Sequence, residues 1–286
     1  MKKFTLTFSM LLMVAMTFAR SFYAARRERS LILTGGTGTS TYYGELANPG
    51  NYINANLNLN VGLQYYFTNR ISTRVEFNWF QLRGDDAKAT PESGRIQRNL
   101  SFESSNLEIS AVGMVNLFAH GDRFYRRPNF NFYGFLGVGL LYFNPKGKDL
   151  VTGEMVALAP LKTEGASYST VTFAIPFGVG GRIKLTPQIN LAAEIGWRKL
   201  FTDYLDDVST TYPGSASFTD PVALRMSDKR DVSVQGTSGG VRGNPKNDDA
   251  YMLLNAKIEY YLPLDFGRGS YNKKRSSIKY KRSRRR

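Results

Sequence analysis

The chain has 286 residues, 38 Lys and Arg against 23 Asp and Glu, and a formal net charge of +15. Its hydrophobic content of 42% supports a packed fold, which excludes wholesale disorder, and no apolar run reaches the roughly 18 residues that a spanning helix needs. The lack of Cys excludes thiol catalysis, disulfides, Cys-ligated zinc and iron–sulfur clusters, and a single His excludes a multi-His metal site.

The first residues have the pattern of a secretory signal peptide. Lys2 and Lys3 precede sixteen uncharged residues, and Thr17-Phe18-Ala19 places small residues at −3 and −1 of a cleavage site. We predict a signal peptide over residues 1–19, with the cleavage position open up to Ala25. An exported chain does not meet chromosomal DNA, so we expect no nucleic-acid partner, although a charge of +15 at first favours one.

Eight segments alternate apolar and polar residues with period two, the pattern of β-strands that have one apolar face. The clearest runs from Leu57 to Phe67, where every odd position is apolar or aromatic. The sequence predicts strands over residues 31–43, 57–67, 71–81, 107–118, 130–143, 171–185, 189–200 and 252–262. Pro176 lies inside the sixth segment and has no N–H to donate, so we expect a bulge there.

The connections between these segments mostly alternate between short and long. Asn69-Arg70 and Thr186-Pro187-Gln188 are tight turns, whereas a long gap runs from Asp206 to Asp248. Outer-membrane barrels combine short periplasmic turns with long external loops. We therefore predict an all-β fold, an eight-stranded antiparallel transmembrane β-barrel over residues 30–264, in the outer membrane of a Gram-negative bacterium with both termini periplasmic. The alternative is a soluble lipocalin-like barrel or a β-sandwich, whose apolar face would point inward.

Aromatic residues gather near the predicted strand ends, as the two interfacial girdles of a lipid-facing barrel require. At the predicted outer ends they are Tyr42, Tyr43, Trp79, Tyr142, Phe143, Trp197, Phe201 and Tyr251. At the predicted inner ends they are Tyr65, Phe67, Phe118, Phe130, Tyr260 and Tyr261.

The polar face of the predicted strands carries five basic and four acidic groups. They are Arg74, Glu76, Glu108, Arg182, Lys184, Glu194, Arg198, Lys257 and Glu259. The interior of an eight-stranded barrel is just wide enough for its side chains, and buried charges must pair. We predict an ion-pair network that seals the lumen, with a narrow charged channel and a catalytic carboxylate pair as the alternatives. No enzymatic activity, cofactor, metal or small-molecule substrate is expected.

The only His, His120, falls in the second predicted periplasmic turn. A His that acts on surface lipid would lie near the outer rim instead. We therefore interpret His120 as an ordinary turn residue.

A basic tail, residues 265–286, follows the last predicted strand. Ten Lys and Arg and no acid lie between Gly267 and Arg286, which leaves a net charge of only +3 on residues 4–266. Such blocks are often interaction tails. Together with the second turn they form a basic periplasmic face, with predicted partner-binding residues Arg123, Arg126, Arg127, Lys273, Lys274, Arg275, Lys279, Lys281, Arg282, Arg284, Arg285 and Arg286. An acidic periplasmic partner or anionic lipid headgroups are the expected ligands; a solvated tail without a role is the alternative.

Several short segments carry a family resemblance. They are Tyr42-Tyr43-Gly44-Glu45-Leu46, residues 63–68, Arg83-Gly84-Asp85-Asp86, residues 98–102, Glu108 and, most specifically, residues 196–209. Across roughly residues 30–265 the chain resembles the PorG family, the outer-membrane barrel component of the type IX secretion system. The resemblance implies a non-enzymatic protein that anchors the periplasmic ring, made of proteins such as PorK and PorN, to the outer membrane. The alternative functions are adhesion or envelope integrity through the loop 206–248, or a narrow pore.

Overall fold

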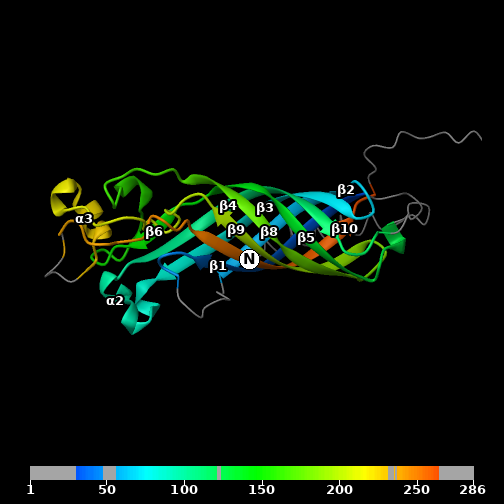
Figure 1. Ribbon diagram of the computed structural model, residues 1–286, viewed down its shortest axis with the longest axis horizontal. Helices are drawn as coiled ribbons and strands as arrows, with labels where there is room; N and C mark the ends of the chain where they lie inside the picture. Colours follow the sequence, from blue (N-terminus) through cyan, green and yellow to red (C-terminus); the bar gives the residue numbers. More distant parts are fainter. Residues whose placement is uncertain (1–29, 48–55, 121–123, 231–234, 236, 264–286) are drawn as a thin grey trace, which may run out of the picture.

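Eight long antiparallel strands close into a barrel in the computed structural model, which describes residues 30–47, 56–120, 124–230, 235 and 237–263 (Figure 1). The strands are β1 Leu31–Tyr43, β2 Asn56–Tyr66, β3 Ile71–Asp85, β4 Ser101–Asn116, β5 Phe130–Tyr142, β8 Val171–Lys184, β9 Ile189–Leu200 and β10 Ala250–Tyr261. Each pairs with its neighbours in sequence order, and β1 pairs with β10 to complete the ring. The predicted barrel and its eight strands are confirmed.

One end of the barrel, which we call the loop end, carries the remaining elements. They are β6 Pro145–Lys148, β7 Met155–Ala157, α2 Arg95–Arg98, α3 Pro221–Ser227 and the 3-10 helices η2 Asp86–Lys88, η3 Pro91–Ser93, η5 Ala159–Leu161 and η6 Ser215–Ser217. β6 extends the sheet by pairing with β4 and β7. The opposite end, the turn end, has the short connections and η4 Phe124–Arg126. No helix in the described ranges is long and apolar enough to span a bilayer.

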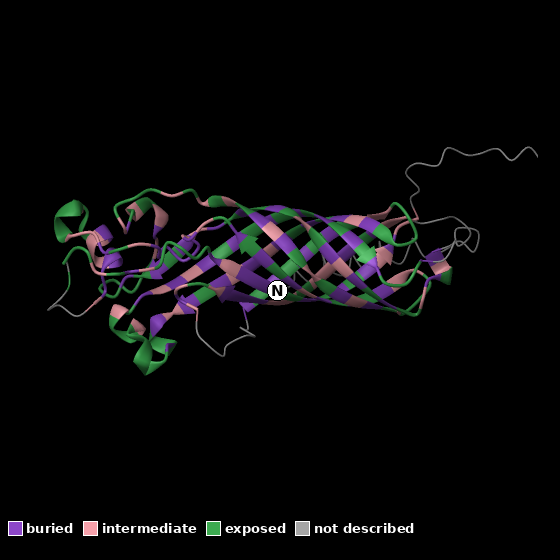
Figure 2. Ribbon diagram, viewed as in Figure 1, coloured by how far each residue is buried: buried purple, intermediate pink, exposed green. Residues whose placement is uncertain are grey.

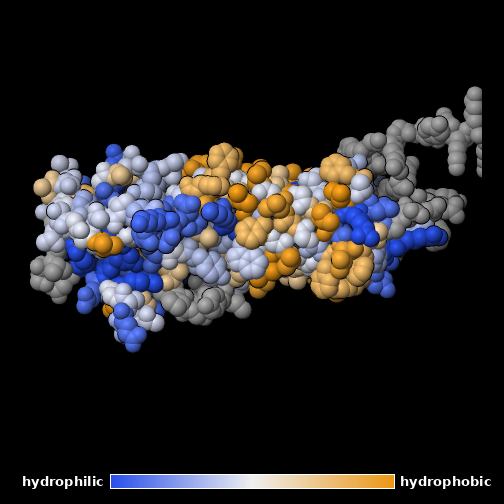
Figure 3. Space-filling model, viewed as in Figure 1, coloured by the Kyte–Doolittle hydropathy of each residue, from blue (hydrophilic) through white to orange (hydrophobic). Residues whose placement is uncertain are grey.

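The strands bury their polar face and expose their apolar face (Figure 2). In β2 the side chains of Asn58 and Gln64 are fully buried, whereas Leu57 and Leu63 are 46% and 49% exposed. Apolar residues form an orange band around the middle of the visible wall, and the loop end is mostly hydrophilic (Figure 3). A soluble barrel or sandwich would have the opposite polarity, because water would face the band, so this wall is built for lipid.

Glycine allows the close approach of β1 to β10 at the seam. A Cβ on Gly38 would lie 1.8 Å from the Leu254 carbonyl oxygen, and one on Gly36 would lie 2.4 Å from that of Ala256. The weakly patterned, Gly-rich first strand is therefore the one that can close the ring, because it has no side chains at these points.

Pro176 interrupts strand pairing without adding a residue. The β5–β8 ladder pairs Gly139 with Ala174 and Leu136 with Phe177, so the register is the same on both sides of the gap. Pairing of Pro176 with Arg198 of β9 continues. The expected bulge is absent: the proline, which has no N–H, removes pairs on one side of the strand only.

Part of the predicted outer girdle lies inside the barrel. Tyr42, Phe143 and Tyr251 are at most 3% exposed and belong to an apolar core at the loop end, together with residues such as Phe80 and Leu200. The inward register of the strands continues into this region, where the loops cover the lumen, so inward aromatic side chains are buried. At the outer ends Tyr142, Trp197 and Phe201 do remain on the outer wall, whereas Tyr261, at the turn end, is buried too.

Candidate functional site

Four of the predicted interior charges meet in one buried cluster, the central quartet: Arg74 and Glu76 from β3, Glu194 from β9 and Lys257 from β10. Arg74 donates from Nη2 to Oε2 of Glu194 at 2.9 Å, and its Nε lies 3.0 Å from Oε2 of Glu76. Nζ of Lys257 lies 2.6 Å from one carboxylate oxygen of each Glu. Two positive and two negative charges cancel here, and all four side chains are at most 3% exposed.

The quartet crosses the lumen. β3 and β9 are four places apart in the ring of eight strands, so the Arg74–Glu194 pair joins opposite walls. Lys257 makes a second connection, from β10 to β3, through Glu76. Polar side chains continue on this inner face, since Asn58 donates to Oδ1 of Asn255 at 2.6 Å.

Two further pairs lie above and below the quartet. Toward the turn end, Arg182 of β8 is 3.4 Å from Glu259 of β10. Toward the loop end, Arg198 of β9 is 3.4 Å from Glu108 of β4, which also accepts a hydrogen bond from the Tyr251 hydroxyl.

The ninth predicted charge, Lys184, stands apart. It donates to the backbone carbonyl of Tyr125 at 2.8 Å and takes no part in the ion pairs. The structure therefore brings together eight of the nine residues, as equal numbers of cations and anions. The charges of these eight side chains cancel, and the ion pairs join strands on different sides of the lumen.

At the turn end, Arg127 differs from the prediction. It is only 4% exposed, and its guanidinium donates to Asn190 Oδ1 and to four backbone carbonyls, those of Phe124, Thr186, Pro187 and Ile189. The prediction of Arg127 as a partner-binding residue is wrong, because its donors already satisfy backbone oxygens of the turns. Arg126 is exposed. The remaining predicted partner residues, Arg123 and those of the tail, lie outside the described residues, as does the predicted signal peptide.

His120 is a packed residue of the turn end rather than an ordinary exposed one. Its ring lies 4.5 Å from that of Tyr66 and 5.8 Å from that of Tyr261, and the Tyr261 hydroxyl is 2.9 Å from Nε2. Burial, with smaller contributions from the charges of Arg182 and Arg127, lowers the pKa of His120 to about 3. The imidazole is therefore neutral at physiological pH. Because His120 lies in a turn, no periodic pattern indicates its burial.

The long connections at the loop end fold into a cap over the barrel. Asp86 of η2 forms ion pairs with Arg95 and Arg98 of α2. Arg242 pairs with Glu164 at 2.7 Å and with Asp207 at 3.3 Å, so it joins two separate loops. Sequence reasoning missed the cap, because Arg242 and Glu164 lie in segments far apart along the chain and loops carry no periodic pattern.

Comparison with known proteins places the chain in a sequence family. The family described as a domain of unknown function, DUF6089, matches residues 6–220. The chain belongs to the DUF6089 family. No curated protein matches it significantly.

Solved structures similar to this DUF6089 chain include three outer-membrane proteins. Neisserial surface protein A has a TM-score of 0.40 and 12% identity, over 81% of this chain and 97% of the other. Ail of Yersinia pestis has a TM-score of 0.41 and 11% identity, over 82% of this chain and 99% of the other. OprG of Pseudomonas aeruginosa has a TM-score of 0.40 and 11% identity, over 84% of this chain and 99% of the other.

The outer surface of the DUF6089 barrel indicates that it lies in a membrane. A closed ring of antiparallel strands has no free edge, its polar groups point inward, and its outward side chains are apolar around the middle. These are the features of a transmembrane β-barrel. The chain is an outer-membrane barrel of the Gram-negative type.

Proposed function

We propose that this DUF6089 barrel is a non-enzymatic membrane anchor of the type IX secretion system, which holds ring proteins similar to PorK and PorN at the outer membrane. The sealed lumen carries the proposal. The pair Arg74–Glu194 connects opposite walls, Lys257 bridges Glu76 and Glu194, and eight of the nine predicted interior charges lie in ion pairs. A barrel without a conduit acts through its two ends. The segments that resemble the PorG family supply the choice of system.

The turn end is the proposed contact surface for the ring. Short turns of outer-membrane barrels face the periplasm, and both β1 and β10 have their terminal ends on this side. Arg126 is exposed here, and the basic tail follows from the same end in sequence. A surface of this charge suits an acidic periplasmic protein or anionic lipid headgroups.

Catalysis has little support from the two groups that were candidates for it. The lumen carboxylates are all paired or hydrogen-bonded. The neutral ring of His120 is packed between two tyrosines at the turn end, away from the loop end where surface lipid would be reached. We propose that the protein is not an enzyme.

Co-purification and secretion test the anchoring role. The barrel is isolated from outer membranes in mild detergent, and ring subunits are sought by mass spectrometry. We expect ring subunits in the complex and a loss of type IX secretion in a deletion strain. Absence of ring subunits together with intact secretion would overturn the proposal.

The role of the tail needs a control for its length. Deletion of residues 267–286 is compared with a tail of equal length in which every Lys and Arg is replaced by Gln. If charge recruits the ring, both variants lose ring subunits to the same degree while the barrel still folds. Retention of the ring by both variants assigns the contact to the turns instead.

Adhesion or envelope integrity is the second candidate, and the cap favours it. The cap is a folded, hydrophilic structure that extends beyond the apolar band (Figure 3). Cell-attachment and detergent-sensitivity assays on a strain that lacks residues 206–248 distinguish this role, because secretion should then be unaffected. A narrow pore is tested by planar-bilayer conductance, for which the sealed lumen predicts no open-channel current.

A further inference from the structure

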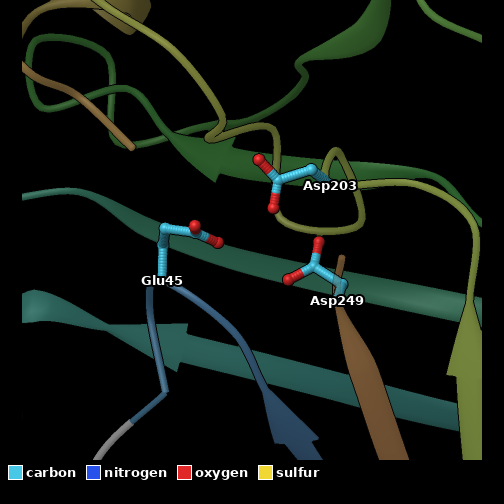
Figure 4. Close-up of side chains that lie close together, drawn as sticks. All are labelled: Glu45, Asp203 and Asp249. Atoms are coloured by element: carbon cyan, nitrogen blue, oxygen red, sulfur yellow. The ribbon is translucent and has the colours of Figure 1, made fainter. Parts of the chain in front are cut away.

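Three carboxylates from three separate segments converge at the base of the cap (Figure 4). Glu45 follows β1, Asp203 follows β9 and Asp249 immediately precedes β10. These strands are neighbours in the ring, and the three chain segments leave it at the loop end, so they bring their acids together. One oxygen of each group lies within 4.8 Å of the others. We call these residues the acidic triad.

The acidic triad has no ion pair with the described residues, and neither has the adjoining buried Asp206. Other buried acids of the cap, Asp86, Asp149, Asp207 and Asp228, each lie within 4.0 Å of an Arg. Arg98 is a nearby cation, but its guanidinium binds Asp86 and the backbone carbonyl of Glu45. Burying carboxylates without a cation is costly, so a positive charge is missing at this point.

Asp203 provides the most direct sign of a ligand. It is 7% exposed, its carboxylate lies among those of the triad, and neither of its oxygens accepts a hydrogen bond. Oε2 of Glu45 is also buried without a partner.

The surroundings hold the triad in place. Asp249 accepts hydrogen bonds from the Tyr42 hydroxyl at 2.7 Å and from the Leu205 backbone N–H at 2.9 Å. The same hydroxyl lies 2.7 Å from Asp206, although it has one proton for two carboxylates. A Cβ on Gly44 would lie 1.9 Å from both Oδ1 of Asp249 and the Tyr42 hydroxyl oxygen, so glycine is needed for this close packing. Two groups with unpartnered oxygens, Glu45 and Asp203, therefore lie beside a third, Asp249, which hydrogen bonds hold in place.

We propose that Glu45, Asp203 and Asp249 bind a hard divalent cation, with calcium preferred, and that this ion ties the ends of β1, β9 and β10 to the cap. Carboxylate oxygens are the ligands of Ca²⁺ and Mg²⁺, and the triad contains no His or Cys that would favour zinc or copper. Ca²⁺ accepts irregular sets of oxygen ligands, whereas Mg²⁺ demands a near-ideal octahedron and gives up its waters reluctantly. A set of three carboxylates from three separate segments therefore favours calcium.

Terbium luminescence tests the site on the full chain, refolded in zwitterionic detergent free of lipopolysaccharide, which itself binds divalent ions. Excitation of the nearby Tyr42 should sensitise bound Tb³⁺. We expect one saturable Tb³⁺ site that Ca²⁺ displaces with a dissociation constant of about 10⁻⁴–10⁻³ M, as in extracellular calcium modules, and that Mg²⁺ displaces less well.

Two conservative variants, Asp203→Asn and Glu45→Gln, are compared with the control Glu92→Gln, an exposed acid of the cap. The triad variants should weaken Ca²⁺ binding at least tenfold and remove the rise of the thermal midpoint that Ca²⁺ gives to the parent; the control should change neither. Glu45 is only half-buried, so its variant serves if Asp203→Asn does not fold. Absence of a saturable site in the parent, which is the outcome if protons neutralise the triad, overturns the proposal. Equal affinity in parent and triad variants overturns it too.

Discussion

Lys257→Met tests the central quartet most sharply. Lys257 has no exposed side-chain surface, and its ammonium group is shared by Glu76 and Glu194. Met retains most of the side-chain volume but removes the charge, so Arg74 alone faces two buried carboxylates. Breaking a buried ion pair in this way costs about 3–5 kcal/mol. We expect the free energy of unfolding to fall by this amount.

The measurement is a urea titration in lipid vesicles, followed by tryptophan fluorescence and by the heat-dependent shift in gel migration. Lys199→Met is the matched control, because Lys199 is exposed on the same barrel, and it should change stability by less than about 0.5 kcal/mol. Adding Glu194→Gln to Lys257→Met restores a one-to-one balance between Arg74 and Glu76, so the double variant should be more stable than the single one. A loss below about 1 kcal/mol for Lys257→Met, or no recovery in the double variant, would refute the claim that paired charges hold the lumen.

Three further predictions concern the turn end and the wall. The pKa of His120 is lowered to about 3 in the folded chain, so its contribution to stability is complete above the unfolded pKa of about 6.5 and is lost as the pH falls toward 3. At pH 5 the loss should be about 2 kcal/mol, measured as the urea-unfolding difference between the parent and His120→Gln; a parallel pH dependence of the two would contradict it. Arg127→Gln leaves several backbone carbonyls without donors, so it should destabilise the barrel by about 2–3 kcal/mol without changing ring association. The control Arg126→Gln, at an exposed position, should leave stability unchanged. Trp197 is on the lipid-facing wall, so lipids with brominated chains should quench its emission, as measured in the Trp79→Phe variant; unquenched emission would contradict the apolar band as the lipid contact.

The alternation of residue types predicted the barrel wall because a strand has only two faces. One polar side chain at every second position is enough to indicate which face is inside, and Leu57 to Phe67 shows this without any tertiary information. The same register assigned the nine interior charges to one face. The pairing of Arg74 with Glu194 across 120 residues could not be read from the sequence, because it depends on the ring order of β3 and β9.

The ends of the barrel were decided by tertiary structure. Periodicity stops where strands give way to loops. No sequence pattern therefore indicates the burial of Arg127 and His120 or the inward position of Tyr251. The acidic triad is the strongest case. Glu45 and Asp203 lie far apart in the sequence, and only the closure of β1 against β10, and of β10 against β9, brings them to Asp249. Local sequence determines which face a side chain takes, whereas contacts between distant segments exist only once the ring has closed.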